Sequence, residues 1–263
     1  MQMDRPQQSL TVLLYDVSSS MEGSKHRAAC EAAVAEINAC DQSHFIVGAF
    51  SHDVIFPSKV PMPAAVACEA VGQLPSPEGG TALYRAVKEA AELVEQILDE
   101  HSAQYDPRLA VIKVLTDGEN TVEDGNLEAA RQAVARLHAR GCVVSLLQAG
   151  DDPTAAEALG VPQAAALYWT DDTVGLTAAC LAACEATTTY RRSMESFNSS
   201  AGTATPAISF SFTPLQRMQS THAQMPARPV PPPLQASQSQ TSPSVQPANP
   251  VPLALGRSNT FSR

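Results

Sequence analysis

The chain has 263 residues, of which 44% are hydrophobic and only 5% aromatic, so its length allows one or two domains with a mainly aliphatic core. Its formal charge of −10 is uneven, because residues 191–263 carry six Arg, no Lys and one acidic residue, which leaves −15 on residues 1–190. An acidic body of this kind disfavours broad nucleic-acid binding, which needs clustered Lys and Arg, and suits a cation or a basic partner.

The N-terminal segment and the cysteines indicate a cytoplasmic protein without membrane contact. Residues 1–8 lack the basic start and apolar stretch of a signal peptide, and no apolar run approaches the roughly 20 residues of a membrane span. Without an export signal, the six cysteines are expected to be reduced thiols. Cys180 and Cys184 lie one helical turn apart, but no second Cys or His pair has matching spacing, which favours burial over zinc binding.

Strand and helix patterns alternate along residues 9–190. Continuous apolar runs are typical of strands buried on both faces, and apolar residues at helical spacing indicate helices with one buried side. In chain order the pattern predicts a strand at 10–15, a helix at 25–40, strands at 45–50 and 54–56, helices at 64–74 and 83–97, a strand at 109–115, a helix at 127–137, a strand at 142–147, a short helix from 153, a strand at 165–169 and a helix at 173–190.

This alternation predicts an α/β fold with a doubly wound, mostly parallel sheet and helices on both faces. The short turn at 51–53 favours a hairpin, so we expect one antiparallel edge strand. Ligands of such sheets bind outside the carboxyl ends of the strands. The loops that follow those ends are therefore the places to look for a site.

The composition changes near residue 190. The segment 191–263 holds 11 of the 20 prolines and is otherwise rich in Ser, Thr, Gln and Ala. A segment with so little apolar surface cannot offset its chain entropy, so we predict a disordered tail there. The expected organisation is a lead at 1–8, one domain at 9–190 and the tail, in which 228–234 favours polyproline II and 208–212 and 253–255 are weak candidates for docking peptides.

Oxygen-bearing side chains follow two of the predicted strands and precede one helix. The first strand ends in Asp16, with Ser18 and Ser20 after it, and a period of two puts these side chains on a common side of an extended chain. Thr81 follows two glycines before a helix, and Asp117 follows a later strand in a Thr-Asp-Gly sequence. Three hydroxyls and two carboxylates at one sheet edge would suit a hard divalent ion, Mg²⁺ or Mn²⁺, rather than zinc or copper.

The motif D-x-S-x-S after the first strand, G-G-T before a helix and T-D-G after a later strand resemble the von Willebrand factor A (VWA) family, in its stand-alone intracellular form. In that family these pieces form the metal-ion-dependent adhesion site (MIDAS), and the resemblance covers roughly residues 8–190. It implies that Ser18 and Ser20 bind the metal directly and that Thr81 joins when ligand is engaged. Asp16 and Asp117 would act through water or accept hydrogen bonds from the ligands.

The resemblance implies a protein-docking module and not an enzyme. A metal held mostly by neutral ligands keeps an open position for an Asp or Glu of a partner protein, and relatives of this type suggest an AAA+ ATPase or a kinase/phosphatase assembly as that partner. Two other functions are weighed: a metal-independent scaffold that binds through its proline-rich tail, and a Mg²⁺-dependent hydrolase. The hydrolase is disfavoured because Ser18 stands where a second Asp would serve as acid or base, and because nucleotide-binding and nucleophile motifs are missing.

Overall fold

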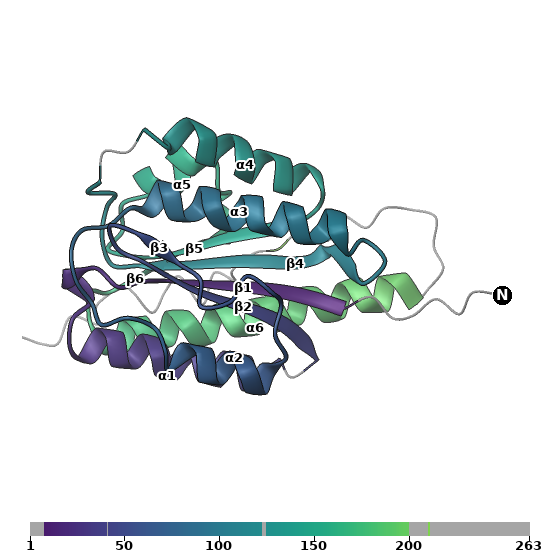
Figure 1. Ribbon diagram of the computed structural model, residues 1–263, viewed down its shortest axis with the longest axis horizontal. Coiled ribbons are helices and arrows are strands. Elements are labelled where there is room, and N and C mark those ends of the chain that lie inside the picture. The colour runs from purple at the N-terminus through teal and green to yellow at the C-terminus, as the bar shows by residue number, and fades with distance from the viewer. Residues whose placement is uncertain (1–7, 41, 123–124, 200–209, 211–263) are drawn as a thin grey trace, which may run out of the picture. The chain divides into compact units, whose positions relative to one another are not determined.

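Four long strands form the centre of a six-stranded sheet in the computed structural model, which describes residues 8–40, 42–122, 125–199 and 210 (Figure 1). All of these residues belong to one unit, residues 1–222. The strands are β1 (Gln8–Asp16), β2 (Ser43–Phe50), β3 (Val54–Ile55), β4 (Tyr105–Thr116), β5 (Val143–Ala149) and β6 (Ala166–Trp169). The continuous apolar runs of the sequence are thus the buried strands of the core.

The sheet order is β3-β2-β1-β4-β5-β6, with all neighbours parallel except β2 and β3. From β1 the chain first adds strands on one side of it and then returns to add β4 on the other side. The strand order therefore reverses between β1 and β4, which is the point where open α/β sheets bind their ligands. The predicted mostly parallel sheet with one antiparallel edge strand is confirmed.

Helices cover both faces of the sheet, as predicted (Figure 1). On one face lie α3, α4 and α5, and on the other lie α1, α2 and α6. The helices are α1 (Ser24–Ala39), α2 (Ala64–Val71), α3 (Leu83–Glu100), α4 (Leu127–Ala139), α5 (Thr154–Leu159) and α6 (Thr173–Ser199), with single 3₁₀ turns η1 (Ser19–Met21) and η2 (Gln163–Ala165). The apolar stripe predicted for 83–97 is the buried side of α3.

One buried ion pair fastens two helices to the sheet. Lys113 lies in the middle of β4, and its ammonium is paired with Glu36 of α1 and donates a 3.0 Å hydrogen bond to the carbonyl oxygen of Ala183 in α6. Both charged side chains are buried, so loss of one partner would leave the other charge uncompensated. This contact fixes α1 and α6 against the same strand.

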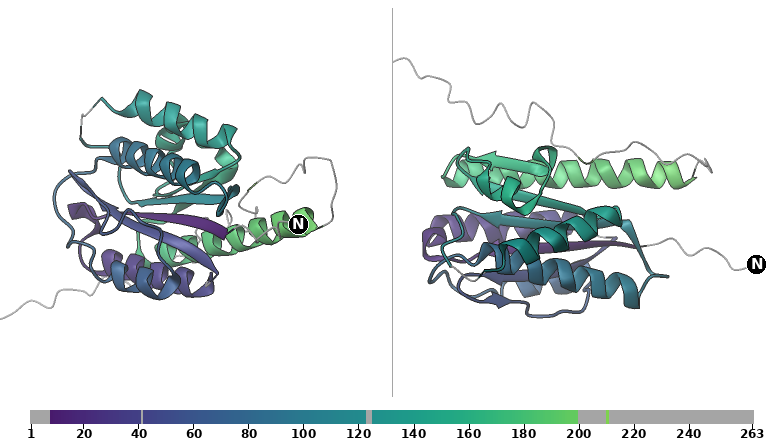
Figure 2. Two further views of the ribbon diagram at one scale, coloured as in Figure 1. Left: turned by 45° about the vertical axis from the view of Figure 1, so that its right-hand side comes forward. Right: turned by 90° about the horizontal axis from the view of Figure 1, so that it is seen from above.

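The last helix continues nine residues past the boundary expected at residue 190 (Figure 2). Its residue Arg191 is only 6% exposed and reaches under the sheet, where it donates to the carbonyl oxygens of Leu10 and Leu109 at 3.0 and 3.1 Å. It also donates to the hydroxyls of Thr11 and Ser43, at 2.8 and 3.0 Å. The prediction that the tail begins at 191 was therefore wrong for residues 191–199, because the hydrogen bonds of Arg191 and the burial of Met194, one turn after Tyr190, hold this part of the helix.

The rest of the predicted tail lies outside the described residues, including the proline-rich segment 228–234 and the candidate peptide 253–255. Within the candidate peptide 208–212, only Phe210 is described, and it is buried with its ring 5.7 Å from that of Tyr190 in an edge-to-face arrangement. The predicted lead at 1–8 also falls outside, except for Gln8, which begins β1. Among the described residues, no helix is both long and apolar enough to cross a membrane.

Candidate functional site

Asp16 ends β1 at the point where the strand order reverses, and it is 1% exposed. One of its carboxylate oxygens accepts the backbone N–H of Ser18 at 2.7 Å, and the other accepts the hydroxyl of Thr116, the last residue of β4, at 2.6 Å. Burial raises the pKa of Asp16, and the nearby charge of Asp117 raises it further, while these hydrogen bonds act in the opposite direction. The neighbouring ends of β1 and β4 are thus joined through a carboxylate whose ionised form would be stabilised by a nearby cation.

A chain of hydroxyls leads from this carboxylate to the second one. The hydroxyl oxygens of Ser18 and Ser20 are 3.0 Å apart, and Ser20 donates to Asp117 at 2.6 Å. The backbone is not extended throughout, as the period-two argument assumed, because the 3₁₀ turn Ser19–Met21 interrupts it. The fully buried side chain of Met21 anchors that turn, and the two hydroxyls still meet.

Thr81 comes from a third loop and lies at the same sheet edge. Its side chain is buried, and its backbone N–H donates to the hydroxyl of Thr121 at 2.8 Å, while its carbonyl oxygen accepts the N–H of Thr121 at 2.9 Å. Its hydroxyl oxygen is 3.8 Å from the position that a Cβ on Gly118 would take. The loops carrying Thr81 and Asp117 are therefore adjacent, as the sequence predicted.

The two glycines before Thr81 allow this close approach. Gly79 has a φ of +74°, and a Cβ at this position would lie 2.5 Å from the ring of His52. The same His52 accepts the backbone N–H of Gly80 at 3.2 Å, and the carbonyl oxygen of Gly79 accepts the N–H of Ser19 at 3.1 Å. The loop before α3 is thus tied both to the β2–β3 turn and to the serine loop after β1.

Lys25, in the first turn of α1, is a site residue that the sequence analysis missed. Its ammonium lies 2.7 Å from a carboxylate oxygen of Asp117 and 2.6 Å from one of Asp171. Partial burial alone would lower the pKa of Lys25, but the hydrogen bonds to these two carboxylates raise it above the ordinary value. A Lys at a helix N-terminus opposes the helix dipole, and this was the available signal that it has an acidic partner.

The donor set fits a hard divalent cation. All five predicted site residues contribute oxygen, and two of them are buried carboxylates that repel each other. The part of the chain that the structure describes holds no cluster of three or more His, Cys, Asp or Glu side chains of the kind that binds a metal through those groups alone. A metal here would therefore be held by the hydroxyls of Ser18, Ser20 and Thr81 together with the carboxylates of Asp16 and Asp117.

Comparison with known proteins supports the fold. No family model matches the sequence, and no curated protein matches it. Proximal thread matrix protein 1 from the mussel byssus superposes with a TM-score of 0.51 at 16% identity, over 68% of this chain and 47% of that one. A second structure of that protein, with a zinc-occupied MIDAS motif, gives a TM-score of 0.53 at 15% identity, over 68% of this chain and 45% of that one.

A solved structure of a single VWA domain also superposes on this chain. The SpRpn10 VWA domain superposes with a TM-score of 0.50 at 11% identity, over 65% of this chain and 93% of the domain. The chain therefore spans about half the length of the byssus protein but nearly all of the isolated domain. At these identities the likeness shows a VWA-like fold and leaves the site's activity to be argued from its own residues.

Proposed function

We propose that this chain is a protein-docking module whose Asp16, Ser18, Ser20, Thr81 and Asp117 form a MIDAS for Mg²⁺ or Mn²⁺. The observation that carries the proposal is the hydrogen-bonded series from Ser18 through Ser20 to Asp117, set beside the buried Asp16. It gathers oxygen ligands, among them two carboxylates, at the sheet edge where this fold binds ligands. The zinc-occupied motif of the byssus protein is consistent with this use of the fold.

The bound ion would supply an electrophilic position for a carboxylate. Because three of the five oxygen donors are neutral hydroxyls and Lys25 already pairs with one of the two carboxylates, the protein neutralises the ion only in part, and an Asp or Glu of a partner can complete its coordination. Thr81, on a loop that is tied to the serine loop, is placed to support that contact. The chain itself would carry out no catalysis, and an AAA+ ATPase or a kinase/phosphatase assembly is the class of partner that we propose.

Lys25 favours one alternative that must be tested. Its ammonium already compensates part of the charge of Asp117, so the same cluster could serve as a metal-independent scaffold in which the lysine takes the place of an ion. The hydrolase alternative has less support. It would need a second carboxylate as general acid or base at position 18, and the hydroxyl of Ser18 cannot take that role. Metal titration separates the docking module from the scaffold.

Isothermal titration of the full chain with Mg²⁺ and with Mn²⁺ is the test. We expect weak, reversible binding that Asp16→Ala and Asp117→Ala each reduce by roughly a hundredfold or more, because each removes a negative charge a few ångströms from a divalent ion. Asp106→Ala is the matched control, since Asp106 is equally buried but pairs with Arg108 at the opposite end of β4. Equal titrations for the wild type and both site variants would exclude the metal site.

A further inference from the structure

Two thiols meet where the C-terminal end of α1 packs on α6, on a different part of the fold from the proposed metal site. Cys40 caps the end of α1, and its sulfur lies 3.9 Å from the hydroxyl oxygen of Thr188 in α6. That hydroxyl donates to the carbonyl oxygen of Cys184, one turn earlier on the same face of α6. Thr188 thus contacts both cysteines, which makes Cys40 and Cys184 neighbours across the contact between α1 and α6.

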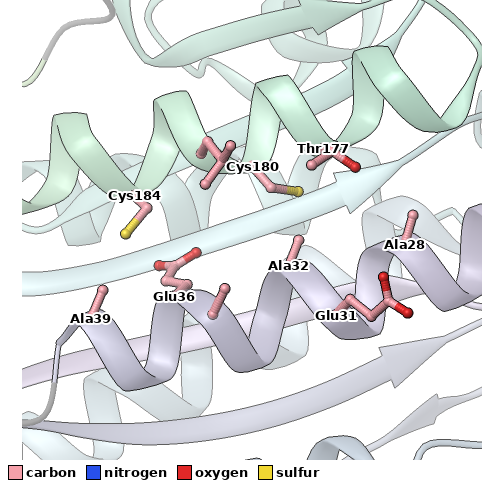
Figure 3. Close-up of a pocket in the computed structure, with 10 residues that line it drawn as sticks. Ala28, Glu31, Ala32, Glu36, Ala39, Thr177, Cys180 and Cys184 are labelled. Atoms are coloured by element: carbon pink, nitrogen blue, oxygen red, sulfur yellow. The ribbon is translucent and has the colours of Figure 1, made fainter.

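The helices approach closely at this place because small side chains separate them. The face of α1 toward α6 carries alanines at every turn, Ala28, Ala32, Ala35 and Ala39, and these line a cavity of about 220 Å³ between the helices. Figure 3 shows Cys184 pointing from α6 toward α1 beside Ala39, the residue that precedes Cys40. Both thiols are partly exposed, so a small oxidant can reach them.

The hydrogen bonds and charges around the pair favour the thiolate of one cysteine. A hydrogen bond from Cys184 and another from Thr188, together with the charge of Arg191, lower the pKa of Cys40 to about 6, although burial and the Glu36 carboxylate act the other way. The same contact raises the pKa of Cys184. The contact between the two thiols thus favours the thiolate on Cys40, with Cys184 as its hydrogen-bond donor.

We propose that Cys40 and Cys184 form a peroxide-sensitive dithiol that closes to a disulfide between α1 and α6. The Cys40 thiolate attacks one oxygen of a hydroperoxide, whose O–O bond breaks to leave a sulfenic acid on Cys40. The departing alkoxide or hydroxide takes from solvent the proton that Cys40 lost on ionising, and it leaves as an alcohol or water. The sulfur of Cys184 then attacks the Cys40 sulfur, and the hydroxide that leaves takes up the Cys184 proton to form water. Two thiols and one hydroperoxide thus give one disulfide, one alcohol and one water.

This site differs from the other described thiols. Cys142 is buried, and burial raises its pKa to about 12, so it serves as an unreactive internal reference. Cys68 is partly exposed like the pair, but its contact is the side-chain oxygen of Asn38 rather than another thiol. Cys68→Ser is therefore the control variant for Cys40→Ser and Cys184→Ser.

The experiment treats the full chain with a small excess of hydrogen peroxide and counts thiols by maleimide labelling after denaturation. We expect loss of two of the six free thiols, a linked Cys40–Cys184 peptide in the digest and restoration by dithiothreitol. Cys40→Ser and Cys184→Ser should each prevent the link, whereas Cys68→Ser should leave it unchanged. The linked peptide is measured on the wild-type chain, so this result does not depend on whether any variant folds.

Other outcomes would overturn the proposal. These are a link between different cysteines, stable oxygen adducts on Cys40 without a link, or six thiols still free after treatment. Alkylation by iodoacetamide at pH 7 gives a second readout, in which Cys40 should react at least roughly tenfold faster than Cys142. Equal rates at these two positions would contradict the activation of Cys40.

Discussion

Lys25 and Asp117 form an ion pair of 2.7 Å, across 92 residues of sequence, at the centre of the candidate metal site. The Asp117 side chain is only 1% exposed, so its charge is compensated within the protein by this lysine. Lys25 also reaches Asp171, which is well exposed and can keep the ammonium without Asp117. Lys25 therefore competes with a metal for the carboxylate of Asp117, and it can stay paired with Asp171 when a metal binds.

The first prediction is that Lys25→Met strengthens metal binding. The variant removes a positive charge near the proposed ion and keeps most of the side chain, so we expect Mn²⁺ affinity to rise by roughly tenfold, which corresponds to about 1.4 kcal/mol. Titration calorimetry measures it, with Lys88→Met as a control that removes a lysine from an ion pair on α3 instead. Affinity that stays equal or falls would show that Lys25 does not compete with the ion.

The second prediction concerns Arg191, which holds the end of α6 under the sheet. Arg191→Met removes four hydrogen bonds and leaves two strand carbonyls without this donor, at a cost of about 3 kcal/mol. We expect the melting temperature to fall by roughly 6–12 °C in a chain of this size. Arg192→Met is the matched control, because Arg192 is the next residue along α6 and is exposed. Truncation after Tyr190 should lower the melting temperature by at least as much. A chain truncated there that melts at the same temperature as the full chain would refute this anchoring role.

The order and type of the elements could be predicted from the sequence because burial sets them locally. Runs such as 10–15 and 109–115 are apolar except for Thr11 and Lys113, and they lie buried on both faces of the sheet. The positions of the candidate site residues could be predicted for a similar reason, since four of them lie at or just after the ends of β1 and β4 and Thr81 precedes α3 at the same sheet edge. Their arrangement around Asp16 and Asp117 needed no knowledge of long-range contacts beyond the strand order.

The missing parts of the prediction depend on pairings between distant polar residues. Lys113 stands out in an apolar strand, but nothing local identifies Glu36 as its partner. Arg191 follows a polar stretch of α6, and its hydrogen bonds to β1 and β4 leave no periodic signal. Lys25 is recognisable only as a cation placed against the helix dipole. Such contacts depend on the assembled fold and not on the pattern of one segment.

The third prediction concerns Gly79, whose missing side chain lets the loop before Thr81 approach His52 closely. Gly79→Ala places a Cβ at a φ of +74° and 2.5 Å from the ring of His52, which costs roughly 1–2 kcal/mol from the backbone alone. We expect melting to fall by about 2–8 °C and metal affinity to fall several-fold, because the loop must shift away from the serine loop. Gly72→Ala is the control, since Gly72 has a helical φ of −68° and a Cβ there would meet only the backbone oxygen of Glu69, at 3.4 Å. If Gly79→Ala leaves both measurements equal to those of the control, the close approach is not required.

Adding His52→Ala to this variant separates the two causes. The double variant removes the clash between the new Cβ and the imidazole but keeps the backbone strain at Gly79. We therefore expect partial recovery of the melting temperature and little recovery of metal affinity, because His52 also accepts the N–H of Gly80 and holds the loop. Full recovery of affinity would show that the clash alone had displaced Thr81.

The last prediction is that partner binding requires both the metal and one acidic residue of the partner. Residues 1–190 carry −15, so long-range repulsion opposes an acidic ligand unless basic residues surround its carboxylate. Exposed charges are screened beyond about 10 Å at 0.1 M salt, whereas a short metal–carboxylate bond is screened much less.

Pull-down of a partner should therefore fail in EDTA, recover with added Mg²⁺ or Mn²⁺, and fail with Thr81→Ala or with the partner's single Asp or Glu replaced. Thr177→Ala is the control, because it removes an exposed threonine hydroxyl on α6 that donates to the Thr173 carbonyl oxygen, and it leaves the five proposed ligands in place. Capture that persists in EDTA, with Asp16→Ala equal to the wild type, would instead support the metal-independent scaffold, in which Lys25 supplies the only cation at Asp117 among the described residues.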